Sequence, residues 1–163
     1  MSVRNCRDIG ENLQKIITRL MANDNLVNLL YYTDKDPLNQ PKLTQEQKKS
    51  LVYQKLIKIV PRIETQEKAN SFVSIQVLSG NQNRENSEFR DITIRAEIFV
   101  PLNQWIIKDS NLRPFAILGE IQESLNEKTI NGLGKMSGGD FELTFLTDES
   151  SCYTQTFRIT NYE

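Results

Sequence analysis

The stretch DITIRAEIFVP, residues 91–101, decides the fold of this chain. Apolar residues fill every second position from Ile92 to Val100, and polar residues fill most of the positions between them. Alternation with a period of two is typical of a β-strand that buries one face and leaves the other in water. Half-buried strands of this kind favour an antiparallel sheet, and Pro101 is expected to end the strand.

Three further strands are expected on the same grounds. Their alternating apolar residues are Val73, Ile75 and Val77, then Phe141, Leu143 and Phe145, and finally Tyr153, Phe157 and Ile159. Residues 148–150 are expected to turn the chain between the last two strands. Residues 56–60 also favour an extended conformation, which Pro61 interrupts.

Helical periodicity marks four segments. Residues 4–21 carry apolar side chains at spacings of three and four, which predicts an amphipathic helix. Asn23 can cap a second helix that ends by residues 31–32. Thr44 begins a capping-box pattern that predicts a third helix over 45–56. A fourth helix is expected over 112–126, with a proline near its start, where proline is tolerated.

Three segments are expected to lack regular structure, namely 33–43, 79–90 and 131–139, and the last two are expected to be flexible loops. The predicted order of elements is helices, two strands, a helix and two strands. We therefore expect one domain over 1–163 of the α+β class, a two-layer structure in which the N-terminal and central helices flank an antiparallel sheet. Residues expected in its core are Leu13, Ile16, Ile17, Ile94, Ile98, Ile117, Ile121 and Phe157.

The composition argues against enzyme chemistry. The 163 residues include no His, which is the commonest general base and metal ligand. The run GLGKM, residues 132–136, lacks the spacing of a phosphate-binding loop. Cys6 and Cys152 lie in no nucleophile motif. No apolar signal segment follows Met1, so we expect both thiols to be reduced, intracellular and buried. We therefore expect no enzyme activity, no catalytic residue, no cofactor and no metal. We also expect no membrane contact, because no apolar run approaches the ~20 residues of a membrane span.

Charge is distributed in two blocks, although the net charge is only −1. Residues 40–70 hold seven Lys or Arg and three Glu, whereas residues 140–163 hold one Arg and five acidic residues. Such runs usually form solvated faces, but opposite blocks could also join neighbouring subunits of a head-to-tail ring. The only Trp fits either a core position or an interface anchor. Candidate subunit-interface residues are Lys48, Lys49, Lys55, Trp105, Asp148 and Glu149, and candidate loop contacts are Arg84, Glu85, Glu88 and Lys135.

The order of these elements resembles the tail-terminator (tail-completion) proteins of bacteriophages. Residues 92–119 combine an alternating strand that ends in Val-Pro, a linker, an Arg and then a helix of small and apolar residues. The run LNEKTINGL, residues 125–133, is similar to the helix end that follows in that family, and a last strand with Tyr153 and Phe157 closes the sheet. The resemblance covers residues 4–31 and 56–163.

The resemblance implies a structural virion protein. Tail terminators are α+β domains that form hexameric rings, cap the finished tail tube, stop its polymerisation and present a surface to the head connector. The implied partners are further copies of the chain, the tail tube protein and the head-completion protein, and DNA would pass through the ring without sequence-specific contacts. The implied location is the head–tail junction of the virion, after assembly in the host cytoplasm.

Two other functions remain open from the residues alone. One is a different neck or head-completion protein, which belongs to the same functional class. The other is a ferredoxin-like module that binds RNA or a ligand and carries exposed aromatic side chains on one sheet face. Phe99 is the single candidate for such an aromatic position, and the segment from Lys42 to Lys68 lacks the interleaved aromatics of a single-strand binder.

Overall fold

The computed structural model describes residues 6–59, 70–85, 88, 90–130 and 134–160. The predicted α+β class is confirmed, because helices pack on a sheet whose six described strands have the order β1-β2-β3-β6-β5-β4. The strands are β1 (Ile57–Lys58), β2 (Phe72–Gln82), β3 (Arg90–Pro101), β4 (Thr129–Ile130), β5 (Gly134–Leu146) and β6 (Ser150–Thr160). The stretch that predicted the fold is thus β3, in the middle of the sheet.

The register of β3 explains its alternation. Ile94 lies opposite Val77 of β2 and Phe157 of β6, so apolar residues of three strands share one face. All eight residues that periodicity placed in the core are buried. This burial is the main term that stabilises the fold, since a fully buried Ile, Leu or Phe contributes about 1.5–3 kcal/mol.

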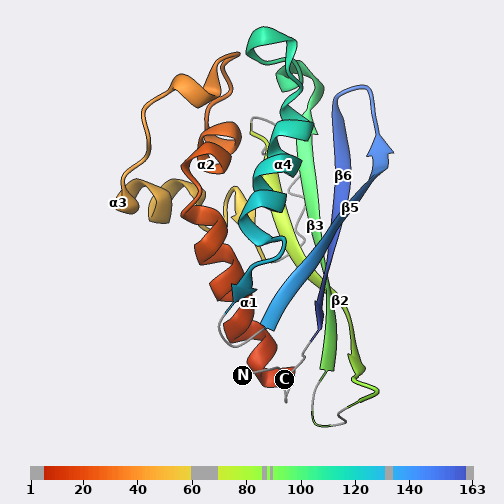
Figure 1. The fold of residues 1–163 in the computed structure, drawn as a ribbon. Helices are drawn as coiled ribbons and strands as arrows, with labels where there is room; N and C mark the ends of the chain where they lie inside the picture. Colours follow the sequence, from red (N-terminus) through yellow and green to blue (C-terminus); the bar gives the residue numbers. More distant parts are fainter. Residues whose placement is uncertain (1–5, 60–69, 86–87, 89, 131–133, 161–163) are drawn as a thin grey trace.

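The apolar face of the sheet is covered by a layer of helices (Figure 1). The helices are α1 (Cys6–Met21), α2 (Asp24–Tyr31), the short α3 (Gln45–Gln47) and α4 (Arg113–Leu125). α1, α2 and α4 lie side by side over the sheet, and their apolar stripes join the same core as the strands. Figure 1 therefore confirms the predicted two-layer arrangement.

The local signals for helix starts are confirmed in detail. Asn23 caps α2 by accepting a hydrogen bond from the Leu26 N–H. Thr44 and Gln47 form the predicted capping box at α3. The helix expected over 45–56 nevertheless ends early, because residues 48–52 form a π-helical turn and Gln54 has a positive φ of 58°. The chain then enters β1.

The sheet is mixed rather than antiparallel throughout. β1 runs parallel to β2, with Ile57 opposite Val73, and the Val73 N–H donates to the Leu56 carbonyl. Alternation reports how a strand is buried but not the direction of its neighbour. The direction of a two-residue edge strand therefore could not be predicted.

Both expected flexible loops are partly strand. Residues 79–82 continue β2 and pair with residues 90–93, and residues 134–139 form the start of β5. Main-chain hydrogen bonds to the neighbouring strand hold both segments, and such bonds need no apolar side chains. Parts of each expected loop, residues 86–87, 89 and 131–133, lie outside the described residues. The expected burial of the thiols is right for Cys152 and wrong for Cys6, which is exposed at the start of α1.

Glycine is required at one position of β5. Gly138 has a φ of +127° at a β-bulge, and a Cβ there would lie 2.8 Å from the Thr156 carbonyl oxygen. Gly138→Ala is therefore expected to lower the free energy of unfolding by at least about 2 kcal/mol. Gly119 of α4 is the matched control, because a Cβ there meets nothing within 4 Å.

Urea unfolding followed by circular dichroism measures both changes. Gly119→Ala is expected to raise the free energy of unfolding by about 0.5–1 kcal/mol, because alanine is the better helix former. Equal midpoints for the two variants would contradict the strained position that the structure assigns to Gly138.

Candidate interaction surface

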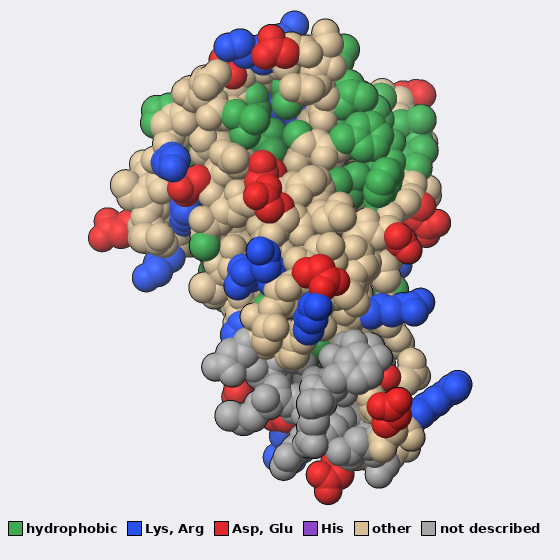
Figure 2. Space-filling model, viewed as in Figure 1, with side chains coloured by type: hydrophobic (Ala, Val, Ile, Leu, Met, Phe, Trp, Pro, Cys, Tyr) green, Lys and Arg blue, Asp and Glu red, His purple; other side chains and the backbone are tan. Residues whose placement is uncertain are grey.

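Apolar side chains gather on the surface between α4 and the β5–β6 hairpin (Figure 2). Phe115 projects from α4 and is 42% exposed, and Phe141 and Leu143 of β5 are 54% and 49% exposed. We call this surface the apolar patch and define it as Trp105, Phe115, Phe141, Leu143, Leu146 and Tyr153. Contiguous exposed apolar surface on a protein commonly marks a site of protein–protein contact.

The aromatic rings of the apolar patch contact one another. The Phe115 ring lies 5.4 Å from Tyr153 and 6.0 Å from Phe141, measured between centroids, and Trp105 lies 6.3 Å from Tyr153. The Trp105 indole N–H donates to the Ser151 hydroxyl at 2.9 Å, which fixes the ring while it packs against the core. The patch is thus a preorganised cluster rather than a set of independent side chains.

Residues 141, 143 and 146 share the helix-side face of β5. The register places Leu143 opposite Tyr153 and Leu146 opposite Ser151, and a bulge between Leu143 and Phe145 turns Phe145 to the other face. The alternation of this strand had predicted burial, so its residues were not among the expected contacts. High exposure of apolar residues is a property of the folded chain, which periodicity alone does not reveal.

Arg113 fixes the start of α4, and its main-chain N–H donates to the Trp105 carbonyl. Its side chain is fully buried and donates to four main-chain carbonyls, those of Leu29, Tyr32, Asp34 and Gln104. Two of these acceptors lie at the C-terminal end of α2, where carbonyls lack helical partners and attract cations. Burial lowers the pKa of Arg113 to about 10, although the Asp34 charge opposes the shift, so the guanidinium remains charged at neutral pH.

One of the candidate interface lysines points into the protein. Lys48 is only 3% exposed, and its ammonium pairs with Asp24 at 2.7 Å. This hydrogen bond is the main reason why the pKa of Asp24 is lowered, and Lys42 pairs with the same carboxylate at 3.3 Å. The prediction that Lys48 lies at a subunit interface is therefore wrong. Its side chain instead joins the segment after α3 to α2.

The other charged candidates are exposed at opposite edges of the sheet. Lys49 and Lys55 lie in the segment between α3 and β1, beside the β1 edge of the sheet. Asp148 and Glu149 lie in the turn between β5 and β6, toward the other edge. Figure 1 shows α3 and this hairpin on opposite sides of the molecule. These four exposed charges of the two blocks are therefore separated in space as well as in sequence.

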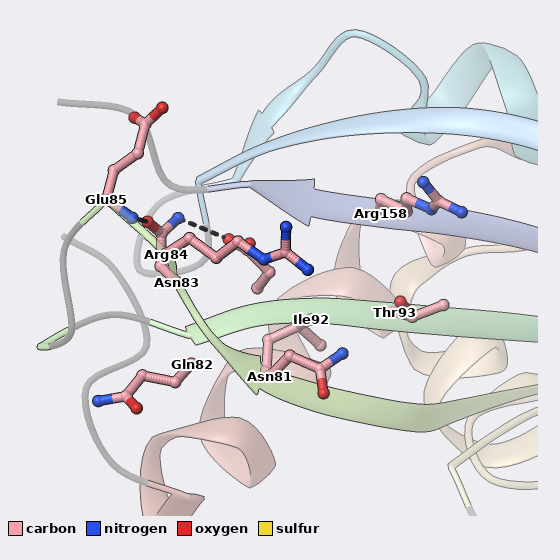
Figure 3. A pocket seen from close by; sticks show the side chains of 9 residues that line it. Asn81, Gln82, Asn83, Arg84, Glu85, Ile92, Thr93 and Arg158 are labelled. Atoms are coloured by element: carbon pink, nitrogen blue, oxygen red, sulfur yellow. Dashed lines mark hydrogen bonds between the residues drawn. The ribbon is translucent and has the colours of Figure 1, made fainter.

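The candidate loop contacts do not form one site. Arg84 and Glu85 line an open polar hollow at the β2–β3 hairpin, together with Arg158 of β6 (Figure 3). Glu88 is exposed in the same hairpin, whereas Lys135 pairs with Glu127 at the start of β5. The Asn83 amide, which lines the hollow, donates to Asp91 at 2.9 Å.

The sheet face away from the helices carries a second, smaller group of aromatic residues. Phe99 stacks on Phe72 with ring centroids 4.9 Å apart, and Phe145 lies 6.1 Å from Phe99. The prediction that Phe99 stands alone on this face is therefore wrong. Cys152 lies between Phe99 and Phe145 in the sheet, and burial, helped by the Glu97 charge, raises the pKa of its thiol to about 11. A thiol that stays protonated at neutral pH is a poor nucleophile.

Acidic and thiol side chains are scattered over the part of the chain that the structure describes. Among the described residues, no group of three or more Cys, Asp or Glu is arranged to hold a metal ion. No helix among the described residues is long and apolar enough to cross a membrane.

Fold and surface together define a small α+β protein whose most distinctive described feature is an exposed, preorganised apolar patch. The chain belongs to the YomW family, whose model matches residues 23–159. The family is derived from Bacillus phages, which suggests a phage association for the chain. No curated protein and no solved structure matches the chain.

Proposed function

We propose that this phage-associated protein is a tail-terminator-like structural subunit. Copies of it would form a closed ring, most simply a hexamer, that caps the tail tube and joins it to the head connector. The family match supports the phage setting, and the resemblance of the element order to tail terminators suggests the position within the virion. In this proposal the protein acts by assembly and without turnover.

The observation that supports the proposal is the placement of exposed charges of opposite sign, Lys49 and Lys55 against Asp148 and Glu149. A head-to-tail ring needs two different, complementary surfaces on opposite sides of each subunit. The basic segment around Lys49 and Lys55 and the acidic turn at 148–149 meet this requirement, since they lie at opposite edges of the sheet. A subunit with both charges on one side would favour a two-fold dimer or no assembly.

Charge reversal tests this arrangement. The double variant Lys49→Glu, Lys55→Glu is expected to shift the assembled ring toward monomers. The wild-type ring should also dissociate as the salt concentration rises, because exposed charge pairs are screened over about 8 Å at physiological ionic strength. Adding Asp148→Lys and Glu149→Lys should partly restore the ring. Light scattering after size-exclusion chromatography measures the mass.

The matched control makes the same change in net charge at positions outside the segment of Lys49 and Lys55 and outside the turn at 148–149. Lys35 and Arg158 are exposed away from both charged edges, so Lys35→Glu with Arg158→Glu should leave the mass unchanged. If the control pair and the test pair dissolved the ring equally, net charge rather than a specific contact would be responsible.

An RNA-binding module is the second candidate, and the aromatic group on the outer sheet face favours it. RNA-binding sheets stack unpaired bases on exposed aromatic rings. Here Phe72 and Phe99 are only half-exposed and stack on each other, while Glu97 forms an ion pair with Arg95 at 2.9 Å on the same face. Salt-sensitive binding of single-stranded RNA that Phe99→Ala abolishes would favour this candidate over the ring.

A further inference from the structure

We propose that the apolar patch is the surface by which one copy of the chain contacts a second copy, and that it receives the segment around Tyr53. This inference rests on the ring proposed above and names the contact that would hold it together. The apolar patch would supply the central, water-excluding part of the interface. The charges would then form its rim.

The apolar patch lacks a cover within the described part of the chain. Leu146 is 60% exposed at the end of β5, and Phe115, Phe141 and Leu143 are each more than two fifths exposed. Leaving these rings and methyl groups in water is costly, and burying them against a partner would recover roughly 25 cal/mol for each Å² of apolar surface. Aromatic side chains of this kind dominate the energy of many protein interfaces.

The contact would be made by side chains rather than by an added strand. β4 pairs with β5 at Gly134 and Lys135, and residues 126–128 bond to Met136 and Gly138. Beyond these contacts, residues 140–146 have no strand on that side among the described residues. Two bulges interrupt β5, one between Gly138 and Asp140 and one between Leu143 and Phe145. Bulges break the regular spacing of main-chain donors and acceptors, and they protect edge strands against strand addition.

Charge complementarity selects the occupant. The apolar patch is bordered by the acidic turn at Asp148 and Glu149. On the opposite side of the molecule, Tyr53 is 37% exposed in the segment that carries Lys49 and Lys55. An exposed aromatic ring in a basic segment matches an apolar patch beside an acidic turn, and complementary potentials of this kind fix the register of an interface.

A symmetrical contact between two apolar patches is disfavoured by the same charges. In a two-fold dimer each residue of the surface meets the same surface on the partner. Both acidic turns would then border the same contact, and neither would meet the basic segment of the partner, which is unfavourable for an interface. The head-to-tail contact avoids this arrangement. Each copy then uses its apolar patch for one neighbour and its Tyr53 segment for the other, as a closed ring requires.

Site-directed cross-linking of the full chain tests the contact. The background is Cys6→Ser, because Cys6 is exposed and would react, while Cys152 is buried. Leu143→Cys labels the apolar patch and Tyr53→Cys labels the opposite segment. A mixture of the two variants treated with a short bismaleimide should give cross-linked dimers, and each variant alone should give none. Phe141→Cys is a second label for the patch, should Leu143→Cys prove unstable.

The outcomes separate this inference from the proposed function. Leu38→Cys is the control, because Leu38 is 44% exposed but lies outside both surfaces, and its mixtures should not cross-link. A ring in light scattering without cross-links between the two labels would overturn the inference and leave the ring proposal standing. Dimers from Leu143→Cys alone would instead show a symmetrical contact and overturn the inference. A chain that stays monomeric at all concentrations would overturn both.

Discussion

Arg113→Met is expected to lower the free energy of unfolding by more than about 3 kcal/mol, a larger effect than that of Gly138→Ala. Methionine has a similar length but donates no hydrogen bond, so four carbonyl groups lose their partner at once. Each buried acceptor left unsatisfied costs about 1–3 kcal/mol, and part of this cost is recovered by relaxation. Urea unfolding of the wild type and the variant measures the difference.

Two controls separate the hydrogen-bond network from the charge alone. Arg113→Lys keeps a positive charge but lacks the planar, forked set of donors, so it should fall between the wild type and Arg113→Met. Arg158→Met removes an exposed arginine from β6 and should change the free energy of unfolding by less than about 0.5 kcal/mol. Superimposable unfolding curves for wild type and Arg113→Met would show that this network does not hold α4 in place.

The core could be predicted from the sequence because burial leaves a periodic trace. The alternation from Ile92 to Val100 identified the central strand, and the stripe in residues 4–21 identified α1. Both patterns arise from one constraint, namely that one face of each element meets the core while the other meets water. The caps at Asn23 and Thr44 were predictable for a similar reason, since both use hydrogen bonds within three residues along the chain.

Segments held by main-chain hydrogen bonds to residues far away in the sequence show no such periodicity. Residues 134–139 contain three glycines and a serine, yet they form the start of β5 because β6 lies beside them. The parallel pairing of β1 likewise depends on how the chain returns to the sheet, and a two-residue strand contains no periodicity. The internal position of Lys48 was hidden as well, because a count of charges does not distinguish a lysine that meets Asp24 from one that meets solvent.

The candidate site was only half accessible to sequence reasoning. Lys49, Lys55, Asp148 and Glu149 were selected by charge, and the structure places them at the surface. The exposed apolar residues of α4 and β5 were missed, because an apolar residue on a regular face is expected to be buried. Whether a helix extends far enough to cover a strand depends on the packing of the whole layer, and α4 leaves this end of β5 uncovered.

Deletion of the gene from the phage that encodes this chain is expected to abolish the formation of complete particles. A terminating ring presents one face that matches the last ring of the tube and another face that does not propagate it. Without that ring, tube subunits would continue to add, or finished tails would not join to heads. Expression of the wild-type chain in trans should restore particle yield, and the chain with Lys49→Glu and Lys55→Glu should restore it less well.

The most direct measurement of the central claim is the distribution of tail lengths in lysates of that deletion strain, recorded by negative-stain electron microscopy. A structural subunit that ends the tail predicts tails of uncontrolled length, or heads and tails that remain separate, and a return to one defined length on complementation. Tails of normal length joined to heads in the deletion strain would contradict the assignment.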